Sequence, residues 1–145
     1  MKDYKKLNQY LSNLAVLNIK LHNLHWNVVG KEFMQLHTFT ETLYEDVFKK
    51  FDDVAELIKI RGEKPLAKMA DYLQNASISE LDDCKFSSTV LLQTIQDDLT
   101  KMKNLATEIR NDAEADGDFG IVADFEDHVA DYSKNLWFIR SNLQS

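Results

Sequence analysis

The chain has 145 residues, a length that fits a single domain spanning residues 1–145, and its composition is that of an ordinary globular protein. The formal net charge of −7 and the pI of about 5.0 argue against nucleic acid as the obvious partner and suit attraction of cations. The single cysteine, Cys84, excludes a disulfide within the chain. The polar first residues do not resemble a secretion signal, and no stretch of about 18 apolar residues could span a membrane, so a cytoplasmic location is expected.

Apolar residues recur every three or four positions near the start of the chain, which predicts a helix whose mostly apolar stripe ends at His25. Gly30 is expected to end this helix. A second helix is predicted from about Phe33 to Arg61, because Gly62 and Pro65 follow as stop signals. The expected inner faces are Leu7, Leu11, Leu14, Asn18, Leu21 and His25 in the first helix, and Phe33, Leu36, Leu43, Val47, Val54 and Ile58 in the second.

Residues 63–83 are the least periodic part of the chain. Within them, Ser77 and Glu80 form a capping-box pattern that predicts a short helix. A third long helix is predicted over about 86–111, with Val90 and Leu91 beginning its inner face, and a fourth over about 121–143. Four long helices with about twenty residues in the middle connection predict an all-α, ferritin-like four-helix bundle in up-down-down-up order, because such a crossover lets the chain return along the bundle.

Four side chains form a candidate metal site: His25, His37, Asp52 and Glu56. Asp52 and Glu56 lie one helical turn apart, so their carboxylates project from one face, and two close carboxylates resist joint ionisation unless a cation lies between them. With two imidazoles they make a donor set that suits iron, manganese or zinc. Iron is the functional choice if positions stay open for an oxidant. Taken singly, each residue is more often structural; together the pattern is more specific.

The placement of these residues also bears on the kind of site. All four lie on the first two predicted helices and the link between them, whereas a di-iron site at a bundle centre draws ligands from all four helices. No Glu-x-x-His motif occurs in the sequence. Half a ligand set from each of two chains is therefore the natural alternative.

The stretch from His25 to Glu41 reads H-W-x-V-x-G-x5-L-H-x3-E and resembles the signature of the Dps family, the miniferritins or DNA-binding proteins from starved cells. The positions of Asp52 and Glu56, fifteen and nineteen residues beyond His37, match the family spacing. F-D-D-V-A-E followed by G-x-x-P resembles a second signature, and the resemblance covers nearly the whole chain. Leu57 stands where the family usually has Arg, and Arg61 where it usually has an apolar residue, so we expect the local packing to differ at these two positions.

The resemblance implies a hollow homododecamer that oxidises Fe(II), preferring hydrogen peroxide to dioxygen, and stores ferric mineral inside. Iron, as Fe(II) and Fe(III), is the implied metal, and consuming it together with peroxide suppresses hydroxyl-radical chemistry. The implied ferroxidase sites lie at two-fold subunit interfaces. His25 and His37 would come from one subunit, and Asp52 and Glu56 from its mate.

Three further residues lie in or beside the signature, and one more histidine, His128, lies late in the chain. Glu41 matches an acidic family position near the site, so the resemblance implies that it supports the metal ligands without binding the ion directly. Trp26 matches a family aromatic beside the site, although a buried helix-end anchor is an equal alternative. His22 could share the face of His25, but its family counterpart does not bind the metal directly, so it is left out of the ligand set. His128 is expected to be a surface histidine.

The acidic residues between positions 112 and 127 admit two readings. From Asp112 onward they imitate a calcium loop, but Ala123 stands at the twelfth position, where a bidentate Glu is needed. The resemblance instead implies a three-fold iron-entry pore, although Ala123 occupies a common pore-aspartate position and the next acid comes one residue late. The expected pore residues are Glu114, Asp118, Asp124 and Asp127.

DNA compaction, the activity that named the family, is the alternative function. DNA-binding members usually carry a mobile basic tail whose phosphate contacts supply affinity. Here 24 residues precede His25, and the first helix needs most of them. The lysines at positions 2, 5 and 6 are interrupted by Asp3, and the sequence given stops just past the fourth predicted helix. We therefore favour iron over DNA as the partner.

Overall fold

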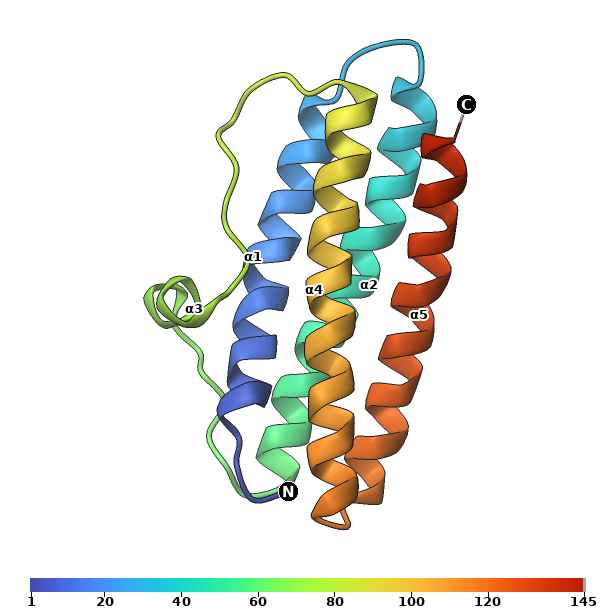
Figure 1. Ribbon diagram of the computed structural model, residues 1–145. Helices are drawn as coiled ribbons and strands as arrows, with labels where there is room; N and C mark the ends of the chain where they lie inside the picture. The colour runs from blue at the N-terminus through green and yellow to red at the C-terminus, as the bar shows by residue number, and fades with distance from the viewer. Residues whose placement is uncertain (145) are drawn as a thin grey trace.

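A computed structural model describes residues 1–144, which form five helices: α1 (Lys5–Asn27), α2 (Phe33–Ile60), α3 (Met69–Asn75), α4 (Ser88–Ala115) and α5 (Phe119–Leu143). The four long helices lie side by side, and α3 lies outside them in the crossover (Figure 1). Because α1 and α5 run one way and α2 and α4 the other, the predicted up-down-down-up bundle is confirmed. None of the described helices combines the length and apolar character needed to cross a membrane.

The turn between α4 and α5 differs from the prediction. α4 continues to Ala115, past the expected end at Asn111, because Ala113 extends the apolar stripe and is fully buried. Gly117 then adopts a φ of +73°, a left-handed conformation that suits glycine and reverses the chain. α5 begins two residues before the expected position, since the Asp118 side chain accepts a hydrogen bond from the Ile121 amide and caps the helix.

The short helix of the crossover exists, but Ser77 does not begin it. α3 ends at Asn75, before Ser77. The Ser77 amide donates to Asn13 Oδ1 over 2.7 Å, and Ser77 Oγ accepts from Asn13 Nδ2 over 3.0 Å. The polar groups that suggested a capping box are therefore used to attach the crossover to α1.

Other asparagines of α1 hold the rest of the crossover. Asn8 Oδ1 accepts a hydrogen bond from the Leu66 amide over 2.9 Å, and Asn23 Nδ2 donates to the Leu81 carbonyl over 3.3 Å. An isolated bridge between Val28 and Phe86 then joins the end of α1 to the start of α4. The crossover thus lies along α1 and returns the chain to the end of the bundle where α2 begins (Figure 1).

The core lies between the four long helices and contains most of the predicted stripe residues. Val90 is an exception, because its side chain is 45% exposed. Ser87 caps α4 by accepting from the Val90 amide, which places Val90 in the first turn, and Leu91 and Leu92 occupy the buried face instead. Leu57, one of the two departures from the family pattern, packs in the core.

Candidate metal centre

His25 in the last turn of α1 lies against His37 in the second turn of α2. Their rings are stacked, with centroids 3.6 Å apart and planes 13° from parallel. His25 Nδ1 lies 2.7 Å from the His37 carbonyl oxygen, and His37 Nδ1 lies 2.9 Å from the His25 carbonyl oxygen. Because a carbonyl oxygen only accepts hydrogen bonds, each Nδ1 carries the hydrogen, and each ring keeps its Nε2 lone pair for a metal ion.

The hydroxyl of Thr40 supports this arrangement. Its oxygen lies 3.0 Å from His25 Nδ1 and donates its own hydrogen to the Leu36 carbonyl over 2.7 Å, so a lone pair faces the histidine. His25 is 5% exposed, and burial lowers its pKa below the usual value. A neutral imidazole is the form that binds metal ions. Thr40 was not singled out from the sequence, although a Thr one turn after a ligand histidine is a usable signal.

The side chain of Tyr44 lies between His25 and His22 and contacts both rings. Tyr44 stands edge-on to His25, with centroids 5.2 Å apart, and stacks on His22 at 3.8 Å. His22 Nδ1 donates to the Asn18 carbonyl over 2.7 Å, which fixes its ring. His22 therefore lies beside the histidine pair without belonging to the stack of His25 and His37.

Glu41 and Trp26, the two residues expected beside the ligands, lie at the same end of the bundle. The Tyr44 hydroxyl donates to Glu41 Oε1 over 3.4 Å, so the carboxylate reaches the surroundings of His25 through Tyr44. Trp26 is 67% exposed, and its ring lies 5.5 Å from that of His22. Within this chain the alternative of a buried helix-end anchor is therefore wrong for Trp26.

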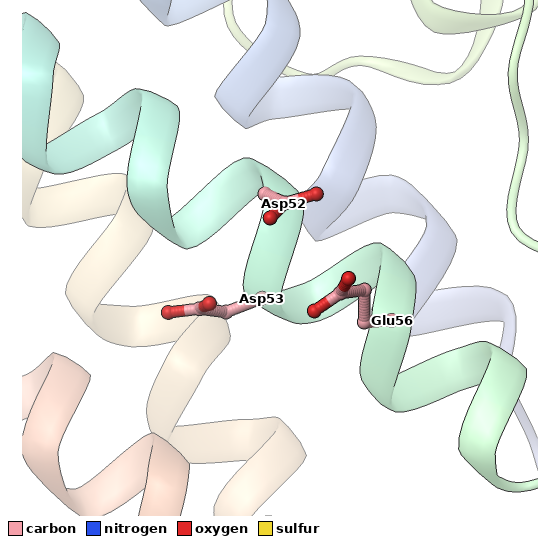
Figure 2. Close-up of side chains that lie close together, drawn as sticks. All are labelled: Asp52, Asp53 and Glu56. Atoms are coloured by element: carbon pink, nitrogen blue, oxygen red, sulfur yellow. The ribbon is translucent and has the colours of Figure 1, made fainter.

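The carboxylate half of the predicted site lies farther along α2. Asp52, Asp53 and Glu56 each offer an oxygen, all within 4.8 Å of one another, and Figure 2 shows the three side chains along the same part of the helix. All three are exposed. Asp53 was not predicted, although its spacing of three from Glu56 makes the two neighbours on a helix. Its Oδ2 also pairs with Lys49 Nζ over 2.6 Å.

The two halves of the predicted site do not meet within one chain. His37 and Asp52 are both on α2, fifteen residues apart, which corresponds to about 22 Å along a helix axis. The histidines lie near the end where α1 meets α2, and the carboxylates lie toward the opposite end. The structure brings His25 together with His37, and Asp52 together with Glu56, but one chain cannot place all four around one ion.

Two of the expected pore residues are held by cations of the same chain. Glu114 accepts from Arg110 over 2.6 Å. Asp118 accepts from Arg61 Nη2 over 2.6 Å and from Arg61 Nε over 2.9 Å, and it lies 3.2 Å from the ammonium of Met1. The Arg61 guanidinium holds the pKa of Asp118 well below its usual range. The Arg that departs from the family pattern is thus explained by its pairing with Asp118.

The other two expected pore residues face a groove between α2 and α5. Asp124 and Asp127 line this groove, which has a volume of about 490 Å³, together with Asp53 and Glu56. Burial, and then the charge of Asp127, raise the pKa of Asp124. The expected pore residues Asp124 and Asp127 on α5 therefore share one acidic groove with Asp53 and Glu56 on α2, and Asp52 does not line it.

His128 was expected at the surface, and this prediction is wrong. It is 8% exposed, and its Nδ1 lies 2.9 Å from the hydroxyl of Tyr10, which also bonds the hydroxyl of Tyr132. Burial lowers the pKa of His128 to about 4. The missed signal is spacing: His128 lies three residues after Phe125 and four before Tyr132, on the buried stripe of α5.

Known proteins resemble this chain in sequence and in fold. Residues 4–145 match the ferritin-like domain family. The DNA protection during starvation protein of Helicobacter pylori is 32% identical over 143 residues, covering 99% of both chains. The crystal structure of a Dps protein from Bacillus brevis superposes with a TM-score of 0.92 at 29% identity, covering 99% of this chain and 100% of that one. The crystal structure of a Dps protein from Vibrio cholerae O1 superposes with a TM-score of 0.92 at 29% identity, covering 96% of this chain and 87% of that one. That protein is described as a member of a broad superfamily of ferritin-like diiron-carboxylate proteins.

Proposed function

The chain belongs to the Dps family of ferritin-like proteins, and from this premise we propose that it is a ferroxidase that oxidises Fe(II), preferably with hydrogen peroxide. The ferric product would be stored inside a hollow homododecamer. Each peroxide takes one electron from each of two Fe(II) ions and, with two protons, leaves as two waters. Because this two-electron reduction consumes both reactants, it forms less hydroxyl radical than one-electron reduction of peroxide, and the cell is protected from oxidative damage.

The observation that carries this proposal is the separation of two complementary half-sites on one chain. One half supplies two Nε2 lone pairs, from His25 and His37, and the other supplies the carboxylates of Asp52 and Glu56. A two-fold axis that places the histidines of one chain against the carboxylates of its mate would complete two equivalent sites per dimer. The mixed nitrogen and oxygen set suits Fe(II), and the carboxylates favour the more highly charged Fe(III) product.

Residues around the two half-sites support the proposed roles of metal binding and iron entry. Thr40 and the two carbonyl oxygens hold the hydrogen of each imidazole on Nδ1, which leaves Nε2 as the atom that can bind metal. Asp124 and Asp127 support an iron path best among the expected pore residues, because neither makes an ion pair within residues 1–144. We place the activity in the cytoplasm, where the exposed thiol of Cys84 would stay reduced.

Kinetics of Fe(II) oxidation by hydrogen peroxide test the proposal. The double variant Asp52→Asn, Glu56→Gln removes both carboxylate charges at exposed positions and should lose most of the fast oxidation phase. Glu45→Gln, an exposed change on the same helix, serves as the matched control and should keep the wild-type rate. Wild-type kinetics in the double variant would refute the site. Anomalous scattering at the iron edge, from crystals soaked in Fe(II), would locate the ion directly.

The alternative of DNA compaction has less support, although relatives are named for DNA protection. A net charge of −7 per chain, multiplied over a shell, repels phosphates. Lys6, one of the few basic residues near the start of the chain, pairs with Asp112 over 2.9 Å. A gel-shift experiment at low salt discriminates the two functions, since a shell without DNA affinity leaves the DNA band unmoved.

A further inference from the structure

Three side chains that the proposed iron site does not use form a hydrogen-bonded group in the core. The Tyr10 hydroxyl on α1 contacts both the Tyr132 hydroxyl and His128 Nδ1 on α5, the latter over 2.9 Å. Tyr10 is fully buried, and Tyr132 is 2% exposed. The Tyr10 ring lies 5.7 Å from that of His128. Two phenols and a base are thus held in contact inside the bundle.

The direction of these hydrogen bonds follows from counting donors. Within residues 1–144, the Tyr132 hydroxyl has no hydrogen-bond partner besides Tyr10. If Tyr132 donates to Tyr10, then Tyr10 donates to His128 Nδ1, and every hydroxyl hydrogen has an acceptor. The opposite direction would leave the Tyr132 hydrogen without one in a buried site, which is costly. Tyr10 therefore points its hydrogen at an unprotonated imidazole nitrogen.

This group lies directly beneath the acidic groove. His128 and Phe125 line the groove together with Glu56 and Asp53. The Phe125 ring is 5.0 Å from the Tyr10 ring and 4.8 Å from the His128 ring, so one layer of side chains separates Tyr10 from the groove. An oxidant formed among the carboxylates of the groove would be close enough to draw an electron from this layer.

We propose that Tyr10, with His128 as its proton acceptor, is a radical trap that reduces one-electron oxidants, hydroxyl radical above all, that arise in the acidic groove. The oxidant takes one electron from Tyr10 and becomes hydroxide, while the phenolic proton moves to His128 Nδ1. His128 releases its Nε2 proton to the groove, where it converts hydroxide to water. The net change is one phenol and one hydroxyl radical giving one phenoxyl radical and one water.

The hydrogen-bond partners assign the radical to Tyr10 rather than to Tyr132. Tyr132 lacks a base, whereas Tyr10 has His128, and the Tyr132 hydroxyl is placed to stabilise the Tyr10 oxygen. Burial keeps the pKa of His128 low, so that the proton passes on to the groove.

The inference rests on the proposed function, since iron and peroxide chemistry supplies the oxidant, and the test is therefore run in two arms. In the first, hydroxyl radicals are produced by photolysis of hydrogen peroxide in metal-free protein, and the frozen samples are examined by electron paramagnetic resonance. Wild-type protein should show a tyrosyl signal, and Tyr10→Phe should lose at least half of it. Ring-deuterated tyrosine confirms that the radical is on tyrosine.

Three further variants keep this arm decisive. Tyr72→Phe is the matched control, because Tyr72 is also buried but donates to the Leu66 carbonyl instead of a base, and it should leave the signal unchanged. His128→Gln should lower the radical yield. Tyr132→Phe should keep the radical but shift its g-tensor at high field, since the hydrogen bond to the Tyr10 oxygen is lost. Thermal melts followed by circular dichroism verify that each variant folds.

The second arm adds Fe(II) and then peroxide to the assembled protein and uses rapid freezing. A tyrosyl radical signal that depends on Tyr10 in this arm supports the radical trap. If wild-type protein shows no such signal, the proposal that Tyr10 traps radicals is overturned. Equal tyrosyl signals in wild type and folded Tyr10→Phe in the first arm also overturn the proposal. If the first arm succeeds while wild-type protein shows no fast Fe(II) oxidation, the proposed function fails and the relay of Tyr10 and His128 stands.

Discussion

His25 and His37 exchange hydrogen bonds: the Nδ1 of each ring donates to the backbone carbonyl of the other residue, and the two rings stack at 3.6 Å. This exchange ties the end of α1 to the start of α2 and fixes the tautomer of both imidazoles. The tautomer that leaves Nε2 open to a metal ion is therefore already present, so binding of the proposed ion would need little reorganisation.

Thr40 should strengthen metal binding through its contact with His25 Nδ1. Thr40→Val keeps the shape but removes the oxygen, and we expect the affinity for Fe(II) to fall about tenfold, as for other residues that orient a metal-binding histidine. Anaerobic titration calorimetry measures this affinity. Thr42→Val is the matched control, because Thr42 is exposed and its hydroxyl, within residues 1–144, bonds only the Thr38 carbonyl. Identical isotherms for Thr40→Val and wild type would show that the carbonyl alone orients His25.

His128 should make the fold sensitive to mild acid. Its pKa is about 4 in the folded chain and about 6.5 when unfolded, so the unfolded chain binds the proton first as the pH falls. The contribution of His128 to the free energy of unfolding is therefore constant above about pH 6.5. It decreases as the pH falls toward 4, by about 3 kcal/mol in total. Urea unfolding at about pH 7 and about pH 4.5, at equal protein concentrations, measures the loss.

His128→Gln isolates this contribution, because the Gln carbonyl can still accept from Tyr10 but does not titrate. The variant should lose clearly less stability than wild type over the same interval. The rest of the sequence is the same in both proteins, so its contribution to the pH dependence cancels in the comparison. Equal losses in the two proteins would mean that His128 is readily protonated in the folded state.

Arg61 should stabilise the end of the bundle at neutral pH through its two hydrogen bonds to Asp118. Arg61→Ala is expected to lower the free energy of unfolding by about 2 kcal/mol, because a mostly buried carboxylate loses its main partner. The difference should shrink below about pH 4, where the unfolded Asp118 becomes protonated. Arg110→Ala is the control, since its pair with exposed Glu114 is worth less than about 0.5 kcal/mol. A similar loss in both variants would contradict a special role for Arg61.

Features with a local cause were predictable from the sequence. The four long helices follow from apolar spacing, and the proximity of Asp52 to Glu56 follows from a separation of four on a helix. Gly117 marks the α4–α5 turn because its φ of +73° suits glycine, although the helix before it runs further than expected. The assignment of His25, His37, Asp52 and Glu56 to one metal stays a prediction.

Features that depend on distant partners were not predictable. Ser77 has a capping pattern, but its amide and hydroxyl pair with Asn13, 64 residues away. The spacing of His128 places it on the buried stripe of α5, but it does not reveal that Tyr10, 118 residues away, supplies its hydrogen bond. Arg61 departs from the family pattern because Asp118 on another helix receives it. In each case a polar side chain satisfies a partner that the local sequence does not reveal.

The proposal that two chains share each iron site gives the strongest test of the site's composition. One variant lacks the histidine half (His25→Gln, His37→Gln), and the other lacks the carboxylate half (Asp52→Asn, Glu56→Gln). Each alone should be nearly inactive in peroxide-dependent Fe(II) oxidation. The two variants are then dissociated, mixed and reassembled, and mass spectrometry verifies that mixed shells form.

In a mixed dimer, one interface receives both damaged halves and the other receives both intact halves. Half of the activity per heterodimer should therefore return, although no chain in the mixture carries all four ligands. A site built within one chain would behave differently, because every chain would stay defective and mixing would restore nothing. No recovery in verified mixed shells would refute the shared site. The separation of about 22 Å between His37 and Asp52 along α2 makes recovery the expected result.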